Sequence, residues 1–225
     1  MNPHDVTRQF EKELCSYTGA PFAVAVNSCT MALTLAVAWC LRPGPQIMLD
    51  EHGSPTEDRQ SVEVPKRTYV SVPQAIIHAG GRPTFRDVNW FGMYQLRPLP
   101  VWDSARWFTS SMYDFPCMVR GIPERRDGEM ICVSFHASKT LGIEQGGAIL
   151  HDNPEADAWF RRARFDGRTE GVAPKDDHFD MIGWHCYMNP STAAQGILRL
   201  HSLPMHNAPL PNDVYPDLSK IEAFR

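Results

Sequence analysis

Residues 30–41 constrain the fold more than any other segment, because nearly all of their side chains are apolar. The segment ends before a Pro-Gly pair, and a helix that is apolar all round is buried on most of its sides. A short apolar run, residues 22–26, precedes it, with the polar pair Asn27-Ser28 in between. The sequence therefore predicts a buried strand, a polar turn and a buried helix in succession.

The same alternation of short apolar runs and helical segments continues along the chain. Further strands are expected at residues 62–64, 83–88, 99–102, 130–135 and 148–150, and further helices at residues 6–17, 72–79, 154–164 and 191–200. Residues 49–61, 113–128 and 168–180 are expected to form loops, and residues 202–225, with four prolines, to lie on the surface. Strands alternating with helices favour an α/β protein with a mixed, mostly parallel sheet flanked by helices.

Composition sets the class of protein. The chain has 225 residues, 43% apolar and 21% charged, which suits one large domain with a real core, alone or with an appendage. A formal net charge of −4 gives no basic surface for nucleic acid, and no apolar run is long enough to cross a membrane. The six cysteines form no CxxC pair and residues 1–14 have no apolar signal core, so we expect reduced thiols in a cytoplasmic protein.

Four polar segments stand where predicted strands end. They are residues 27–30, residues 65–69, Asp103 and residues 134–139. Ligands of α/β sheets collect at the carboxyl ends of the strands, so we expect these segments to converge on one site.

Each polar segment has a chemical interpretation and a plainer alternative. The turn Ser28-Cys29-Thr30 opens a helix and could bind a phosphate, or be an ordinary helix N-cap; no P-loop or GxGxxG motif is present. Lys139 could form a Schiff base with an aldehyde, or be a solvated surface lysine.

Asp103 and Tyr69 are the remaining candidate residues at the predicted strand ends. Asp103 could hold a cationic ring nitrogen or cap the following helix, and Tyr69 could stack on a flat ligand or pack in the core. Taken together, a phosphate cradle, an amine, an acid and an aromatic side chain are what pyridoxal 5′-phosphate (PLP) requires.

The chain also resembles a known family, the DegT/StrS-like sugar aminotransferases, which are PLP enzymes of fold type I. The matching motifs are Asn-Ser-Cys-Thr-Met-Ala-Leu at 27–33, residues 64–69, 75–88, Trp-Asp-Ser-Ala-Arg at 102–106, Ser-Phe-His-Ala-Ser-Lys at 134–139, Gly-Gly-Ala at 146–148, residues 164–168 and residues 183–200. They occur in the family's order across residues 10–200.

The resemblance implies a role for each matched position. Lys139 would be the Schiff-base lysine and proton shuttle, Asp103 would pair with the pyridinium nitrogen, and Tyr69 would stack on the ring. The phosphate would be held by the turn at 28–31 (Ser28, Cys29, Thr30 and Met31, the last two largely by backbone) with Ser134.

Three further positions would line the cofactor site. His136 would lie near the cofactor, or make a structural hydrogen bond instead. Arg106 stands where the family usually has glutamine or histidine near the phenolic oxygen, and His185 where it has an asparagine that reaches the neighbouring subunit's phosphate. No metal site is expected, because His201 with His206, or His185 with Cys186, lacks a four-ligand spacing.

The resemblance also implies the organisation of the chain. Residues 1–200 would form the PLP-binding large domain, and residues 201–225 a remnant of the family's small C-terminal domain. We expect a compact member that completes its site with a partner subunit, the alternative being an inactive remnant.

The expected activity is transfer of an amino group from an amino acid, with glutamate as the expected donor, to a keto group of a nucleotide-linked sugar. The chain would act as a homodimer with a shared active site. Two alternatives stay open: a PLP enzyme acting on a non-sugar ketone or a modified nucleotide, and a catalytically degenerate PLP-binding homologue.

Overall fold

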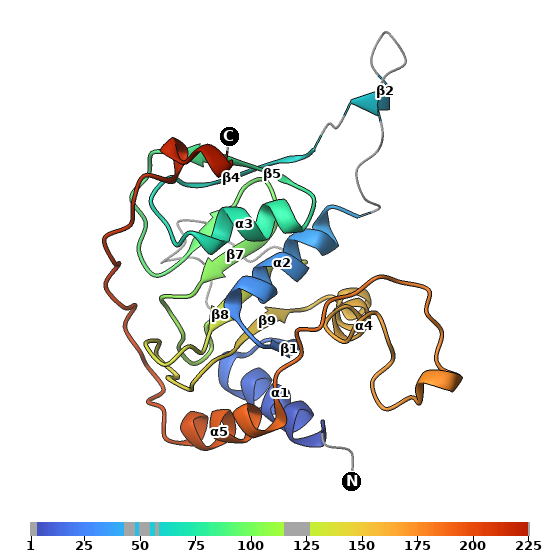
Figure 1. Cartoon of the computed structure of the whole chain (residues 1–225). Helices are drawn as coiled ribbons and strands as arrows, with labels where there is room; N and C mark the ends of the chain where they lie inside the picture. The colour runs from blue at the N-terminus through green and yellow to red at the C-terminus, as the bar shows by residue number, and fades with distance from the viewer. Residues whose placement is uncertain (1–3, 43–47, 50–54, 57–58, 115–126, 225) are drawn as a thin grey trace.

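A computed structural model of the chain describes residues 4–42, 48–49, 55–56, 59–114 and 127–224 (Figure 1). The helices are α1 (Asp5–Thr18), α2 (Cys29–Cys40), α3 (Ser71–His78), α4 (Pro154–Ala163) and α5 (Pro190–His201), with 3-10 turns η1 (Pro174–Asp176), η2 (Leu218–Lys220) and η3 (Glu222–Phe224). The strands are β1 (Phe22–Val26), β2 (Met48–Leu49), β3 (Pro55–Thr56), β4 (Ser61–Pro65), β5 (Arg82–Arg86), β6 (Tyr94–Leu96), β7 (Val101–Ser104), β8 (Met130–Ser134) and β9 (Gly147–His151).

The helices begin and end where local signals place them. Gly19 ends α1 in a left-handed conformation with φ 80°, which glycine adopts without steric cost. Asn153 and Asn189 cap α4 and α5, and a proline occupies the first turn of each. The five expected helices are thus confirmed to within a residue or two at each end.

The central sheet has five strands in the order β1-β9-β8-β7-β6. It is mixed, as expected, but the expectation of mostly parallel pairing is wrong. Within it only β7 and β8 are parallel, while β1 with β9, β8 with β9 and β6 with β7 are antiparallel. Residues 97–100 join β6 to β7, and so short a connection can join only antiparallel strands.

A two-stranded parallel sheet, β4 with β5, extends the structure beyond β6. A bridge between Glu63 and Arg97 links its first strand to the end of β6. The pairing of β4 and β5 keeps the predicted order of strand, helix α3 and parallel strand. Most of the expected loop at 49–61, and residues 115–126 of the loop at 113–128, lie outside the described residues.

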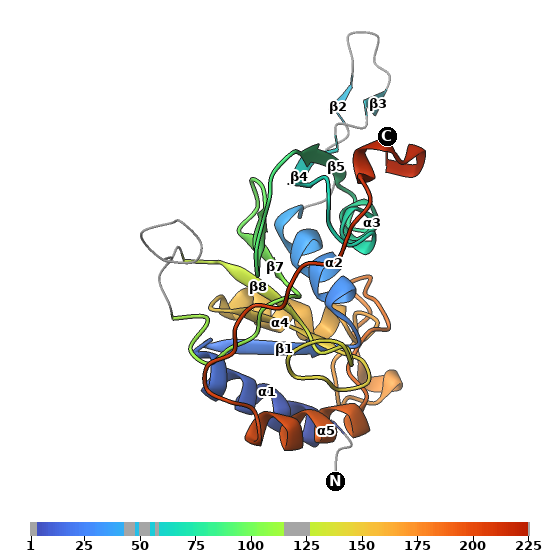
Figure 2. The same ribbon diagram turned by 90° about the vertical axis from the view of Figure 1, so that its left-hand side faces the viewer.

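Helices cover both faces of the central sheet, as Figures 1 and 2 show. On one face α2 and α4 contact β1, whose Val24 and Val26 belong to one core cluster, and α3 packs on α2. On the other face α1 contacts β1, whose Ala23 and Ala25 belong to a second core cluster, and α5 packs on α1. This alternation follows from the two-residue period of a strand. Its result is a three-layer α/β fold in which seven of the twelve residues of α2 are buried and none is exposed, in agreement with its composition.

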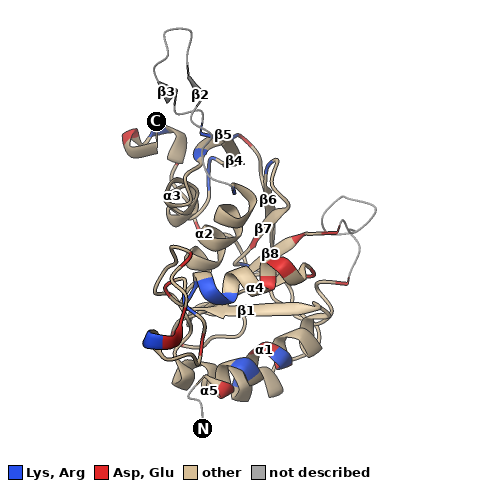
Figure 3. Ribbon diagram, turned by 90° about the vertical axis from the view of Figure 1, so that its right-hand side faces the viewer, with Lys and Arg blue, Asp and Glu red and all other residues tan. Residues whose placement is uncertain are grey.

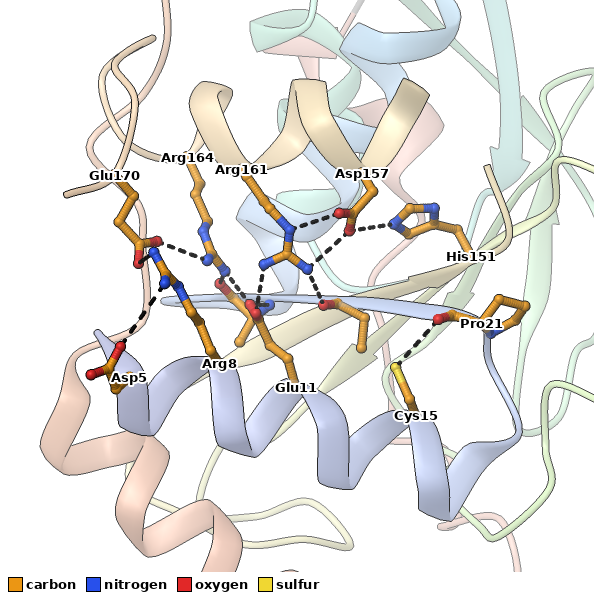
Figure 4. A network of polar contacts seen from close by, with 12 residues as sticks. Asp5, Arg8, Glu11, Cys15, Pro21, His151, Asp157, Arg161, Arg164 and Glu170 are labelled. Atoms are coloured by element: carbon orange, nitrogen blue, oxygen red, sulfur yellow. Dashed lines mark hydrogen bonds and ion pairs between the residues drawn. The ribbon is translucent and has the colours of Figure 1, made fainter. Parts of the chain in front are cut away.

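Charged side chains from α1 and α4 cover the free edge of β1 (Figure 4). The Glu11 carboxylate accepts a hydrogen bond from the Ala25 N–H at 2.9 Å and pairs with Arg161 at 2.7 Å and with Arg164. The Arg164 guanidinium donates to the Ala25 carbonyl at 2.6 Å, and Arg161 donates to the Ala23 carbonyl at 3.4 Å. Figure 3 shows the charges of both signs on these two helices. The edge is thereby closed to pairing with another strand.

The C-terminal residues lie mostly on the surface, as expected, but they are attached to the rest of the molecule. They run from α5 to the region of β4 and β5, across the side of the molecule that Figure 2 turns to the viewer. Leu218 is fully buried, and its N–H donates to the Lys66 carbonyl at 2.8 Å. No helix in the described part of the chain has both the length and the apolarity to cross a bilayer.

Candidate active site

A cavity of about 460 Å³ lies where the four polar segments meet. Its lining includes nine of the residues expected from the sequence, namely Ser28, Cys29, Thr30, Tyr69, Asp103, Arg106, Ser134, His136 and Lys139. The expected convergence is therefore confirmed. Met31 and His185 do not line it.

The start of α2 forms one side of the cavity. The Ser28 hydroxyl caps the helix by accepting from the Met31 N–H at 3.2 Å, and the hydroxyls of Thr30 and Ser71 lie 2.8 Å apart. Gly147 at the start of β9 packs against this turn, and a Cβ there would lie 2.5 Å from the Cys29 backbone nitrogen. The helix dipole and three nearby hydroxyls, those of Ser28, Thr30 and Ser134, make this side suitable for an anion.

Asp103 lies next to the last residue of β7, at the buried side of the cavity. One carboxylate oxygen accepts from the Tyr94 hydroxyl at 2.7 Å and the other from the Ala105 N–H at 2.9 Å. Burial raises the pKa of the Asp103 carboxyl, while these hydrogen bonds and the Lys139 charge lower it. The carboxylate is thus oriented and buried, and a further cation beside it would stabilise its ionised form.

Tyr94 is a site residue that the sequence interpretation missed. It lies directly opposite Asp103 in the β6–β7 pair, and its hydroxyl is also 2.6 Å from that of Thr68. A three-residue strand gives too little periodicity to be recognised, so only the strand pairing could reveal this contact.

Lys139 lies in the turn after β8, half-buried, on the same cavity as Asp103. Its backbone N–H bonds the His136 carbonyl at 2.8 Å, and in the described structure its amine has no hydrogen-bonding partner. Burial is the main cause that lowers the pKa of this amine, and the Arg106 charge is the next. A larger fraction of the amine is therefore neutral, and nucleophilic, than in an ordinary lysine.

The other expected residues occupy different surroundings. The Tyr69 side chain is 61% exposed at the cavity wall, so it is not a core residue. His136 faces the cavity but shares a local hydrogen bond of 3.0 Å with the Ser138 hydroxyl. His185 pairs with Asp166 at 2.8 Å, and its side chain is 70% exposed, away from this cavity.

Two residues of the C-terminal part also line the cavity, Asp213 and Tyr215. Asp213 pairs with Arg106 at 2.9 Å, and Tyr215 stacks against Trp90 with ring centroids 6.2 Å apart. No sequence signal indicated them, because their position depends on the path of the chain after α5.

A larger cavity, about 690 Å³, lies between α1 and α4. The charged side chains around it form ion pairs with one another: Arg161 pairs with Glu11 and Asp157, and Arg8 pairs with Glu170 (Figure 4). Cys15 there is a poor nucleophile, because burial raises its pKa to about 11. In the described ranges no group of three His, Cys, Asp or Glu residues could hold a metal ion.

Comparison with solved structures shows which proteins share this fold. Helicobacter pylori PseC, an aminotransferase involved in the biosynthesis of pseudoaminic acid, is 18% identical with a TM-score of 0.62 over 88% of this chain and 57% of its own. The sugar aminotransferase CalS13 of Micromonospora echinospora is 18% identical with a TM-score of 0.64 over 87% and 60%. Bacillus subtilis NtdA, solved with bound pyridoxamine phosphate (PMP), is 19% identical with a TM-score of 0.62 over 88% and 48%. The expected fold is therefore confirmed.

Sequence comparison agrees with the comparison of structures. The spore coat polysaccharide biosynthesis protein SpsC of Bacillus subtilis (strain 168) is 40% identical over 83 residues, which are 36% of this chain and 18% of SpsC. The family model of the DegT/DnrJ/EryC1/StrS aminotransferases matches residues 2–98 and 119–209. Because that match covers most of its length, the chain belongs to the DegT/DnrJ/EryC1/StrS aminotransferase family.

Proposed function

We propose that the chain binds PLP in this cavity and transfers an amino group from an amino acid, with glutamate as the donor, to a keto group of a nucleotide-linked sugar. One observation carries the proposal: the Lys139 amine and the Asp103 carboxylate line the same cavity, with the start of α2 as a third wall. Membership of the family and the sugar aminotransferase CalS13 among proteins of this fold support the reaction class.

The residues present fit the cofactor. The hydroxyls of Ser28, Thr30 and Ser134 and the helix dipole suit its phosphate, and the Asp103 carboxylate suits its ring nitrogen. Tyr69 at the cavity wall would cover the ring face, and Lys139 would supply the amine for the covalent link. When bound, PLP supplies an electron sink for carbanion chemistry.

The protein's own groups would control the protons. Lys139, whose pKa burial and Arg106 lower, can act as a neutral amine and then accept and return a proton at its Nζ. Asp103 must stay ionised to hold a cationic nitrogen, and the donors Tyr94 and Ala105 N–H stabilise its ionised form against burial.

Replacing Lys139 tests the assignment. We expect Lys139→Ala to lose both the visible absorbance of the PLP-loaded protein and amino transfer from glutamate, since the cavity lining in the described residues contains no second lysine. Lys175→Ala, which changes an exposed lysine of η1, should alter neither. An unchanged spectrum in Lys139→Ala would overturn the proposal.

The same preparation decides between the alternatives. A panel of nucleotide-linked keto sugars and other ketones tests the acceptor. Cofactor loading without conversion to the amine form by any amino acid would indicate a degenerate PLP-binding homologue instead.

We also propose a cytoplasmic homodimer with a shared active site. His185 supports the shared site, because it is exposed and lies off its own chain's cavity, as suits a residue that serves a partner's site. The free thiols of the five cysteines in the described ranges support the reducing location.

A further inference from the structure

Arg106 is a buried cation on the wall of the candidate active site. Its side chain is 10% exposed, yet the guanidinium makes a single ion pair in the described structure, from Nη1 to Asp213 at 2.9 Å. Its Nε is buried and has no hydrogen-bonding partner. An arginine fork can bind a carboxylate through two parallel N–H groups, so the present contact uses only part of what this side chain offers.

The partner of Arg106 comes from an exposed and extended stretch, residues 204–217, which we call the C-terminal segment. The Asp213 side chain is 64% exposed, although it lines the cavity. An ion pair with one exposed member is weak, so a carboxylate from solution can compete with it.

The C-terminal segment is held on either side of Asp213 rather than by Asp213 alone. The Leu210 N–H donates to the Arg106 carbonyl at 2.7 Å, and the Asn212 amide donates to the Trp90 carbonyl at 2.7 Å. Beyond Asp213, Tyr215 stacks on Trp90. The Asp213 side chain can therefore leave Arg106 while the segment stays attached elsewhere.

The charges of the cavity define the ligand that Arg106 would receive. With Asp213 removed, the cavity lining keeps two basic side chains, Arg106 and Lys139, and two carboxylates, the buried Asp103 and the exposed Glu144, and in the described structure Arg106 has no ion pair with either. The start of α2 already provides a place for a phosphate, and the group that Arg106 now holds is a carboxylate.

We propose that Arg106 binds a carboxylate of the amino-acid donor, and that Asp213 of the C-terminal segment occupies this position as an internal competitor. This inference rests on the proposed function for the donor's identity. The binding of a carboxylate can be measured without turnover and without the cofactor.

The test is calorimetric binding of glutarate, a dicarboxylate that has no amino group to transfer, to the full-length chain. We expect Asp213→Asn to tighten glutarate binding about three-fold, which corresponds to loss of a weak exposed ion pair. Arg106→Gln should weaken binding about ten-fold or more, and Arg106→Lys, which keeps the charge but not the fork, should lie between.

A matched variant separates competition from a general charge effect. Glu144→Gln removes one negative charge from the same cavity lining, without an ion pair to Arg106 in the described structure, and should leave glutarate binding unchanged. In the Arg106→Gln background, Asp213→Asn should also have no effect, because its action passes through Arg106.

Hydrogen exchange gives a second readout. Glutarate should speed exchange of the amides around Asp213 in the unmodified chain, because it displaces that side chain. The role of Asp213 as a competitor would be overturned if Glu144→Gln tightened glutarate binding as much as Asp213→Asn does. It would also be overturned if glutarate bound and left these amides as protected as before. If the binding of UDP depended on Arg106 and the binding of glutarate did not, the assignment of a carboxylate as the ligand would be overturned. Each result is independent of whether Lys139→Ala loses the visible absorbance.

Discussion

At the scale of single residues, the site depends on two ionisable groups whose surroundings act in opposite ways. Burial raises the pKa of the Asp103 carboxyl and lowers the pKa of the Lys139 amine. Burial disfavours the charged form of each, and each charge in turn favours the other's ionisation. Sequence motifs identified both residues, but Tyr94, which orients the carboxylate, was visible only from the pairing of β6 with β7.

The pKa of Lys139 leads to a prediction about pH. Aldehyde labelling trapped by borohydride, and followed by mass spectrometry at Lys139, should rise with pH at a midpoint below the usual 10.5, because labelling needs the neutral amine. Arg106→Gln should move the midpoint upward by removing a repelling charge. A midpoint at or above 10.5 would contradict the prediction.

The same shift has a consequence for stability. The unfolded chain binds the Lys139 proton up to pH 10.5, whereas the folded chain releases it at lower pH. Below the pKa that Lys139 has in the folded chain, its buried positive charge lowers the free energy of unfolding. The free energy of unfolding contributed by this group then rises with pH between the folded and the unfolded pKa of Lys139.

At the scale of elements, β1, the strand that leads into the turn at the start of α2, is held at its free edge by charged side chains. Glu11 and Arg164 are buried, and both hydrogen-bond Ala25 of β1. Apolar periodicity predicted β1 and α1 but could not show that residues so far apart in sequence pair, because that contact forms only when α1 and α4 pack on β1.

Breaking this pair should weaken the whole domain. We expect Glu11→Gln to lower the free energy of unfolding by about 3 kcal/mol, because it removes the buried counter-charge that Arg161 and Arg164 share and leaves them only Asp157 and Glu170. Urea unfolding followed by circular dichroism measures this. Glu13 lies on the same helix, α1, and its carboxylate forms a more exposed pair with His201 of α5. Glu13→Gln should therefore lower the free energy of unfolding by less than about 1 kcal/mol. Equal effects of the two changes would show that the Glu11 network does not stabilise the edge.

At the scale of the whole molecule, the cavity is closed partly by the C-terminal segment and, in our proposal, completed by a second copy. The chain spans 57% of the length of PseC and 60% of that of CalS13.

A shared site predicts complementation between inactive variants. Lys139→Ala and His185→Ala chains should each lose amino transfer, and their mixture, after exchange of subunits, should regain part of it. Each mixed dimer would then contain one site with an intact Lys139 and the partner's intact His185. Light scattering that shows a monomer with cofactor bound, or no recovery on mixing, would contradict the shared site.

The sequence by itself determined the order of the helices and of the longer strands, the family, and nine of the residues that meet at the cavity. These follow from apolar periodicity, capping residues and short motifs, all of which are local. Only the tertiary structure decided the antiparallel pairs around β9, the partner of Asp103, the charged edge of β1 and the position of Asp213 on Arg106. Each of these is a contact between different elements, and its free energy depends on how those elements pack, which no local pattern records.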